Sequence, residues 1–192
     1  MELHNNLIFV PVQVNGSGPH SFLVDTGASE SFLNTQLASL LGFGSKQHKT
    51  NIGAGESSTN VGSAKGVALS LAGIDLPAES VAVIPLAEIE AEIGFKIDGI
   101  VGAELFRRYV VTIGYGAKQL SLCDPGKFDY GNHSCALILR LSGNRPFIHV
   151  QITPLNGVPI EGEFVDVEKH HFCANGLNPV IENVHLVREN RL

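Results

Sequence analysis

The chain has 192 residues, which is the length of one domain or of one domain with an added fragment. Hydrophobic residues make up 44% and charged residues 17%, so the chain can bury a core and does not have the composition of a disordered protein. The net charge of −6 argues against a nucleic-acid partner, because phosphate binding needs a basic face, and no apolar run approaches the roughly 18 residues of a membrane helix.

The N-terminal residues and the cysteines say little about the compartment. Residues 1–5 are neither basic nor followed by an apolar core, so we expect no signal peptide, although an exported protein whose signal had been trimmed would look the same. The three cysteines cannot all pair within one chain, and we expect free thiols in a reducing compartment at Cys123, Cys135 and Cys173. The localisation therefore stays open.

The first part of the chain predicts a hairpin and a short helix. Residues 7–14 alternate between apolar and other side chains as in a strand, residues 15–19 are rich in turn formers, and residues 21–24 form the second strand. Further on, Asn34 can cap a helix that ends near Gly42 and carries Leu37, Leu40 and Leu41.

The middle of the chain predicts further short strands. Residues 50–57 are polar and glycine-rich and predict a mobile loop, and their G-x-G is no dinucleotide fingerprint because no helix pattern follows it. A hairpin is expected from residues 67–71, a turn at 72–73 and a returning strand at 76–84. Residues 85–93 can form one or two helical turns.

Two more elements complete a first domain. Residues 97–106 predict a short apolar strand that is stopped by a glycine and followed by a helical stub. Residues 109–113 and 120–123, with a turn between them, predict a last hairpin. Many short strands with regular turn signals indicate an all-β domain, closed or sandwich-like, over residues 1–125.

A weak repeat follows the first domain. Residues 126–136 read as a linker, and residues 144–166 echo the strand, turn and strand of residues 5–25, ending in an acid at Asp166. Val167, Glu168 and Lys169 follow that acid, and nothing like the rest of the first unit comes after them. We interpret residues 137–192 as a partial, degenerate start of a second lobe with a weakly ordered tail.

Residues 22–29 are the strongest candidate for a catalytic segment. Three apolar residues lead directly to Asp25, Thr26 and Gly27, which carries a carboxylate out of a dry strand into a tight turn. Such a charge is costly unless other groups compensate it. Asp, Thr and Gly are also ordinary turn residues, so the motif taken alone fits an ordinary strand-to-turn junction as well.

A second motif makes the first one more specific. Residues 100–102, Ile-Val-Gly before a short helix, lie about 75 residues after Asp25-Thr26-Gly27-Ala28. With both motifs in this order, the chain resembles the retropepsin-like (gag-polyprotein-like) aspartic peptidases, above all the bacterial aspartyl proteases with one or two lobes. The resemblance covers residues 5–123 well and 145–166 faintly.

The resemblance implies an all-β acid-protease lobe with one or two short helices, acting as an aspartic endopeptidase without cofactor or metal. Such an enzyme hydrolyses peptide bonds with a water that is activated by a pair of aspartates. The polypeptide substrate would lie extended in a cleft between two lobes. Residues 50–57 or the hairpin after them would form the lid.

The resemblance also implies a role for each residue of the first motif. Asp25 would be the catalytic acid, Thr26 would hydrogen-bond to the partner loop, and Gly27 would let the backbone turn. Ala28 is small and lacks the hydroxyl that some relatives donate to the carboxylate, which predicts activity in mildly acidic solution. Residues 100–102 would support this loop from behind.

One lobe supplies one such aspartate, so the second is expected from a homodimer. Asp166 could supply it within the chain, but we disfavour this because no Thr and Gly follow it. Asp98 belongs to the resembling pattern and fits a turn acid better than a proton donor. The alternative function is a non-catalytic, truncated relative that keeps the fold as a binding or scaffold module.

Other chemistries have less support. Ser29 and Ser31 have no histidine and acid arranged around them, so a serine hydrolase is not indicated. The spacing of the C-terminal histidines and cysteine matches no structural zinc site, so we predict no metal at His170, His171, Cys173 and His185.

Overall fold

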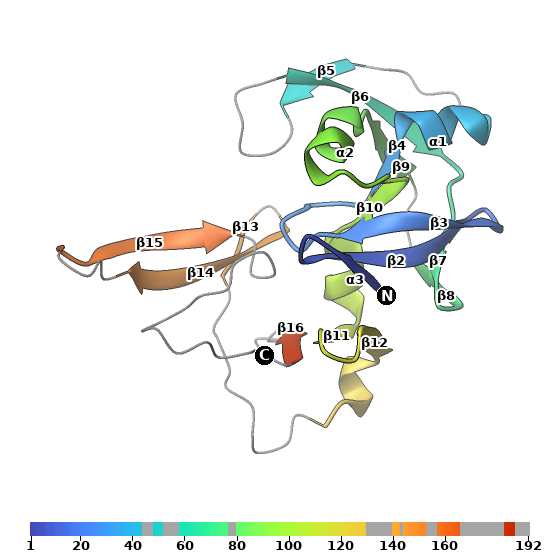
Figure 1. Cartoon of the computed structure of the whole chain (residues 1–192). Helices are drawn as coiled ribbons and strands as arrows, with labels where there is room; N and C mark the ends of the chain where they lie inside the picture. Colours follow the sequence, from blue (N-terminus) through green and yellow to red (C-terminus); the bar gives the residue numbers. More distant parts are fainter. Residues whose placement is uncertain are drawn as a thin grey trace.

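The described residues of the computed structural model are 1–43, 48–51, 58–76, 80–129, 140–142, 144–152, 157–165 and 183–186. Most of them lie in strands, which form one ten-stranded sheet and two three-stranded sheets (Figure 1). The ten-stranded sheet curls into a half-barrel with short helices beside it. The all-β class predicted from the sequence is therefore confirmed.

The ten-stranded sheet has the strand order β5-β6-β9-β4-β10-β3-β2-β7-β8, and β1 pairs with β2 beside this path. Its strands are β1 (Glu2–His4), β2 (Leu7–Val14), β3 (Ser17–Val24), β4 (Phe32–Asn34), β5 (His48–Asn51), β6 (Ser58–Lys65), β7 (Leu69–Leu71), β8 (Ile74–Leu76), β9 (Ser80–Ile84) and β10 (Gly99–Val101). The helices of the described residues are α1 (Thr35–Leu40), α2 (Ala87–Ile93), α3 (Ala103–Arg108) and the 3-10 turn Pro125–Lys127.

The hairpin of β2 and β3 confirms the first predicted element. Val10 and Val12 pack in one apolar cluster, whereas Phe9 packs in another. The same division splits the end of β3, where Phe22 lies in the first cluster and Leu23 in the second. The strand that leads to Asp25 is thus buried on both faces, which fixes the start of the following loop firmly.

Asn34 caps the helix α1, as the sequence predicted, and it is also the last residue of β4. Its side chain accepts a hydrogen bond from the amide of Gln36 at 3.1 Å, so it is the N-cap of the helix. The side-chain amide of Asn34 also donates to the carbonyl of Ile97 at 2.7 Å. Leu37 is buried, but Leu40 is 80% exposed, so only part of the predicted apolar stripe faces the core.

One predicted hairpin is wrong in its second strand. The strand β7 does turn back at Ala72 and Gly73, but it pairs with the short β8. Residues of the expected return strand form β9 instead, and β9 pairs with β4 and β6. A local apolar pattern predicts a strand but not its partner, because pairing between distant segments depends on the whole sheet.

The strand β10 lies between β3 and β4 in the sheet. It pairs in parallel with β3, where Val101 is the partner of Val24, and antiparallel with β4, where Ile100 is the partner of Phe32. The chain therefore leaves β3, makes a loop over residues 25–31, and returns as β4 on the far side of β10. This arrangement places the Ile-Val-Gly motif directly beside the Asp-Thr-Gly motif.

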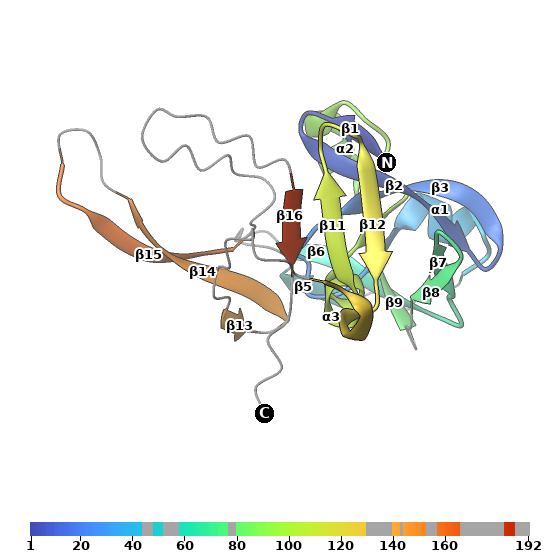
Figure 2. The same ribbon diagram turned by 90° about the horizontal axis from the view of Figure 1, so that it is seen from below.

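A second sheet follows α3. The predicted hairpin is present as β11 (Val110–Gly114) and β12 (Gln119–Cys123), and Cys123 is a free thiol. In the tail, for which the sequence predicted no regular element, β16 (Asn183–Leu186) pairs antiparallel with β11 (Figure 2). The C-terminal part of the chain thus returns to the first domain.

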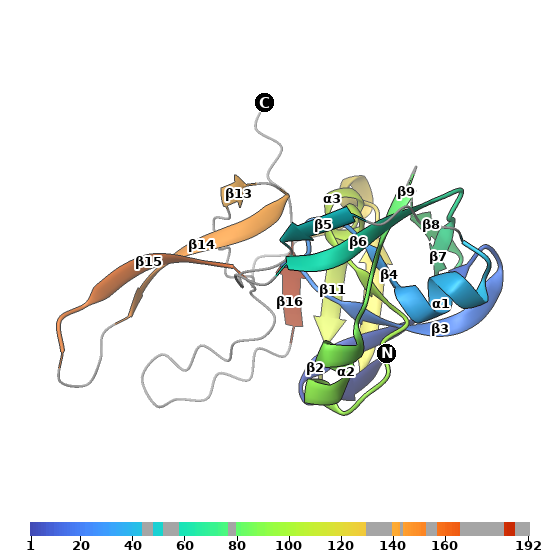
Figure 3. The same ribbon diagram turned by 90° about the horizontal axis from the view of Figure 1, so that it is seen from above.

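The third sheet repeats the start of the chain. It consists of β13 (Arg140–Ser142), β14 (Arg145–Ile152) and β15 (Ile160–Val165), and it projects beyond the ten-stranded sheet (Figures 1 and 3). Arg140 is the partner of Phe147, as Glu2 is the partner of Phe9, so β13 and β14 have the register of β1 and β2.

Some predictions fall outside the described residues. Residues 52–57 of the loop predicted at 50–57 are among them. The others are both cysteines other than Cys123, the acid of the repeat and two of the histidines, namely Cys135, Cys173, Asp166, His170 and His171. Within the described part of the chain, no helix is long and apolar enough to cross a membrane.

Candidate active site

The loop of residues 25–31 is attached to the segment behind it at its beginning and at its middle. The amide of Asp25 donates to the carbonyl of Val101 at 3.0 Å, which continues the pairing of β3 with β10. In the middle of the loop, the carbonyl of Ala28 accepts from the amide of Ala103 at 3.0 Å. The two predicted motifs are therefore bonded to each other through their backbones.

The Asp25 carboxylate lies at a half-buried position at the start of this loop. It accepts a hydrogen bond from the amide of Gly27 at 2.9 Å, which partly compensates the charge that the dry strand end would otherwise disfavour. Thr26 is 2% exposed, and Ala28 is 8% exposed and packs in the same apolar cluster as Leu23. The four predicted site residues thus share one short, well-anchored loop.

Glycine is required at position 102 by the close approach of the loop. A Cβ built at Gly102 would lie 2.6 Å from the carbonyl carbon of Glu30 and 3.0 Å from the carbonyl oxygen of Ala28. Both neighbours are backbone atoms, which cannot turn aside as a flexible side chain can. The absence of a side chain at Gly102 is what lets the loop lie directly on this segment.

The end of the loop is held by two side chains that the sequence analysis did not assign. Ser31 is 3% exposed, and its amide and hydroxyl donate to the two oxygens of the Glu104 carboxylate at 3.0 and 2.9 Å. The Ser31 hydroxyl also accepts from the amide of Gly102 at 3.1 Å. The sequence held a signal for this contact. It has an acid in the first turn of the helix after Gly102 and a hydroxyl just before β4.

Glu30 adds a second carboxylate near Glu104. Partial burial raises the pKa of Glu30 above its ordinary value of 4.5, and the negative charge of Glu104 raises it further. The loop therefore carries an acid whose charged form is disfavoured in the folded protein.

Asp98 is engaged by Ser21 and Lys96 and not by the Asp25 loop. Its carboxylate accepts from the amide of Ser21 at 3.0 Å and forms an ion pair with Lys96 at 2.8 Å. The hydrogen bond to Asp98, and then its charge, raises the pKa of Lys96. Ser21 is four residues before Asp25 on β3, which at about 3.3 Å per residue puts Asp98 roughly 13 Å from Asp25. This separation fits the prediction that Asp98 is not a proton donor to the site.

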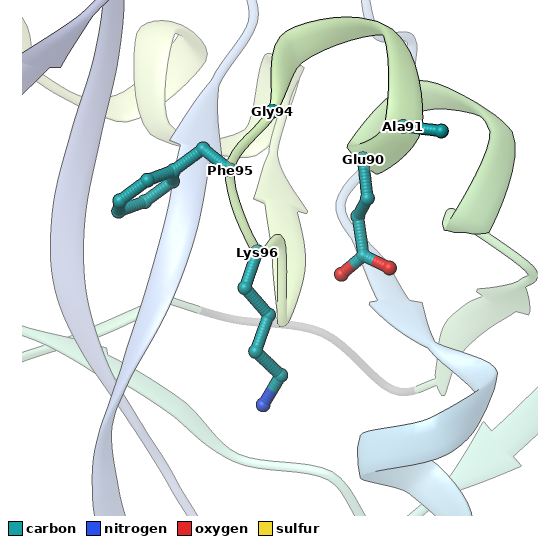
Figure 4. Close-up of a pocket in the computed structure, with 5 residues that line it drawn as sticks. All are labelled: Glu90, Ala91, Gly94, Phe95 and Lys96. Carbon is teal, nitrogen blue, oxygen red and sulfur yellow. The ribbon is translucent and has the colours of Figure 1, made fainter.

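A shallow depression lies beside α2, away from the loop. It is lined by Glu90, Ala91, Gly94, Phe95 and Lys96 (Figure 4). None of the loop residues contributes to it, and the Glu90 carboxylate is already engaged there by the amide of Ile97 at 2.8 Å. Among the described residues, no group of three or more His, Cys, Asp or Glu side chains could hold a metal ion.

The comparison with protein families decides the assignment. The family model described as aspartyl protease matches residues 10–105, which contain the Asp25 loop and the Gly102 segment. The chain belongs to the aspartyl protease family. The match runs from within β2 into α3, so the curled sheet and the anchored loop are the part of the chain that carries the family pattern. A comparison with curated protein sequences gave no match.

Several solved structures resemble this family member. They include the retroviral protease-like domain of Ddi1 from Leishmania major, with 20% identity, 60% of this chain and 87% of that chain covered, and a TM-score of 0.42. A retropepsin-like aspartic protease from Rickettsia conorii has 22% identity, 54% and 71% coverage and a TM-score of 0.36. The EIAV protease in complex with the inhibitor HBY-793 has 21% identity, 47% and 89% coverage and a TM-score of 0.33.

Proposed function

We propose that the chain is an aspartic endopeptidase in which Asp25 is the catalytic carboxylate and two copies of the chain form the active unit. The observation that carries this proposal is the attachment of the Asp25 loop to residues 101–104, together with its place in the aspartyl protease family. A rigid loop of this kind keeps a carboxylate at a fixed place, as general acid–base catalysis requires.

The chemistry needs two carboxylates that share one proton. The ionised one takes a proton from a water, and that water attacks the peptide carbonyl, while the protonated one donates a hydrogen bond to the carbonyl oxygen. Two carboxylates held close together titrate as a pair because both cannot be charged at once. Thr26 would hold the two loops in register, and Gly27 would let the backbone turn at the acid.

The second aspartate is assigned to a second copy for two reasons. Asp98 is roughly 13 Å from Asp25 by the rise of β3. We do not assign it to Asp166 of the repeat, because Val167 and Glu168 follow that acid in the sequence where Thr and Gly follow Asp25. A twofold dimer supplies the second Asp25 by symmetry.

The substrate class that fits this arrangement is an extended polypeptide in a cleft between the two lobes, bound through main-chain hydrogen bonds. The strands β5 and β6 form an antiparallel pair, with residues 52–57 between them, and we assign the lid to this hairpin. We keep residues 1–125 as the protease lobe, 126–136 as the linker and 137–192 as a partial second lobe. The register shared by β13–β14 and β1–β2 supports the last assignment.

The alternative is a non-catalytic relative that keeps the fold as a binding module, and the incomplete repeat after residue 137 is the feature that favours it. Sedimentation at several concentrations, combined with cleavage of an unstructured polypeptide, separates the two. The proposal expects a dimer that cleaves and an Asp25→Asn variant that dimerises but does not cleave. A strict monomer without activity would support the binding module.

A further inference from the structure

We propose that Glu104 is a positioning residue for Asp25, acting through Ser31. This inference rests on the proposed function, because it concerns the loop that would carry the catalytic acid. The loop of residues 25–31 is attached to the segment behind it at three points. Its beginning and middle are attached by bonds between backbone atoms, whereas its end depends on the side chains of Ser31 and Glu104.

Three hydrogen bonds join Ser31 to Glu104 and Gly102 at the end of the loop. Both carboxylate oxygens of Glu104 accept from Ser31, one from its amide at 3.0 Å and the other from its hydroxyl at 2.9 Å. The same hydroxyl accepts from the amide of Gly102 at 3.1 Å. Each oxygen of the Glu104 carboxylate accepts one of these two bonds, whereas an amide at this position has a single acceptor oxygen and cannot accept from both the amide and the hydroxyl of Ser31.

Burial and charge strengthen these three hydrogen bonds. Ser31 is 3% exposed, so water cannot readily replace a bond that is lost there, and an unpaired buried donor is costly. Hydrogen bonds to an ionised acceptor are shorter and stronger than neutral ones. Glu104 also lies in the first turn of α3, where a negative charge is favoured by the helix dipole.

The consequence for Asp25 follows from the geometry of a short loop. If the end at Ser31 loosens, only the beginning and the middle keep the carboxylate in place. A misplacement of about 1 Å can cost about 100-fold in rate. We therefore expect the loss to appear in kcat and not in KM, because the extended substrate is bound mainly by other parts of the cleft.

The test is a double-mutant cycle in the full-length chain with Glu104→Gln, Ser31→Ala and the double variant. The matched control is Glu92→Gln, the same change of charge at an exposed position on α2. Each single variant is expected to lower kcat at least about tenfold, with KM within about twofold. The double variant is expected to fall no more than about twofold below the worse single variant, since both remove one shared set of bonds. A kcat equal to that of Glu92→Gln, or losses that multiply in the double variant, would overturn the inference.

Amide hydrogen exchange separates this inference from the proposed function. In Glu104→Gln, the amides of residues 25–31 are expected to exchange at least about tenfold faster than in the wild type, with no such change in Glu92→Gln. If the wild type cleaves nothing, the proposed function fails, and exchange still decides about Glu104. Unchanged exchange in the loop of Glu104→Gln would show that Glu104 does not hold it.

Discussion

The substitution Gly102→Ala tests the close approach between the two motifs. A Cβ at this position would lie closest to the carbonyl oxygen of Glu30 and 2.6 Å from its carbonyl carbon, whereas ordinary contacts begin at 3.4 Å, so the loop must move by at least roughly 0.8 Å. Overpacking of this kind costs about 1–3 kcal/mol of folding stability. For a chain of this length, such a loss lowers the thermal midpoint by about 2–12 °C.

The same displacement should reduce activity. A shift of the loop approaching 1 Å is expected to lower kcat by about 10- to 100-fold, because Asp25 begins the loop that moves. The matched control is Gly116→Ala, since a Cβ at exposed Gly116 meets nothing within 4 Å. The thermal midpoint and the cleavage rate are measured for both variants and compared. A Gly102→Ala protein with the midpoint and rate of Gly116→Ala would refute the reasoning.

Two further predictions concern pH. A serine hydroxyl in Ala28→Ser can donate to the Asp25 carboxylate and favour its charged form, so the pH optimum of cleavage should move lower, and an unchanged or higher optimum would count against this. Because burial and then Glu104 raise the pKa of Glu30 above 4.5, the folded state loses stability as the pH rises from 4.5 through this raised pKa. Glu30→Gln should therefore raise the thermal midpoint slightly at neutral pH and leave it unchanged well below pH 4.5; equal shifts at both pH values would contradict it.

The local patterns of the sequence predicted most of the lobe. The alternation of residues 7–14 and the turn after them predicted the hairpin of β2 and β3, and the position of Asn34 before a short apolar stretch predicted the helix cap that accepts from Gln36. The Ile-Val-Gly motif predicted a strand and a helical stub, which are β10 and α3. These features depend on neighbours in the chain, so they can be read from the sequence.

The features that the sequence did not predict depend on distant partners. The strand β9 was expected to return along β7, but its register with β4 and β6 is set by the whole curled sheet. The pairing of β16 with β11 joins residues about 70 positions apart. The bonds between Ser31 and Glu104 span 73 residues, and neither residue lies within Asp25-Thr26-Gly27-Ala28 or Ile100-Val101-Gly102. Such contacts have no local signal beyond a polar side chain beside apolar ones.

The central claim is that two chains each supply one Asp25, and a mixing experiment tests it most directly. Asp25→Asn chains are added to a fixed amount of wild type, above the concentration needed for dimers, and the cleavage rate is measured after subunits have exchanged. If each active unit needs two wild-type chains, a tenfold excess of the variant should leave about one tenth of the activity, because most wild-type chains then have an inactive partner. A rate that is unchanged by the added variant, or cleavage by Asp25→Asn alone, would contradict the account.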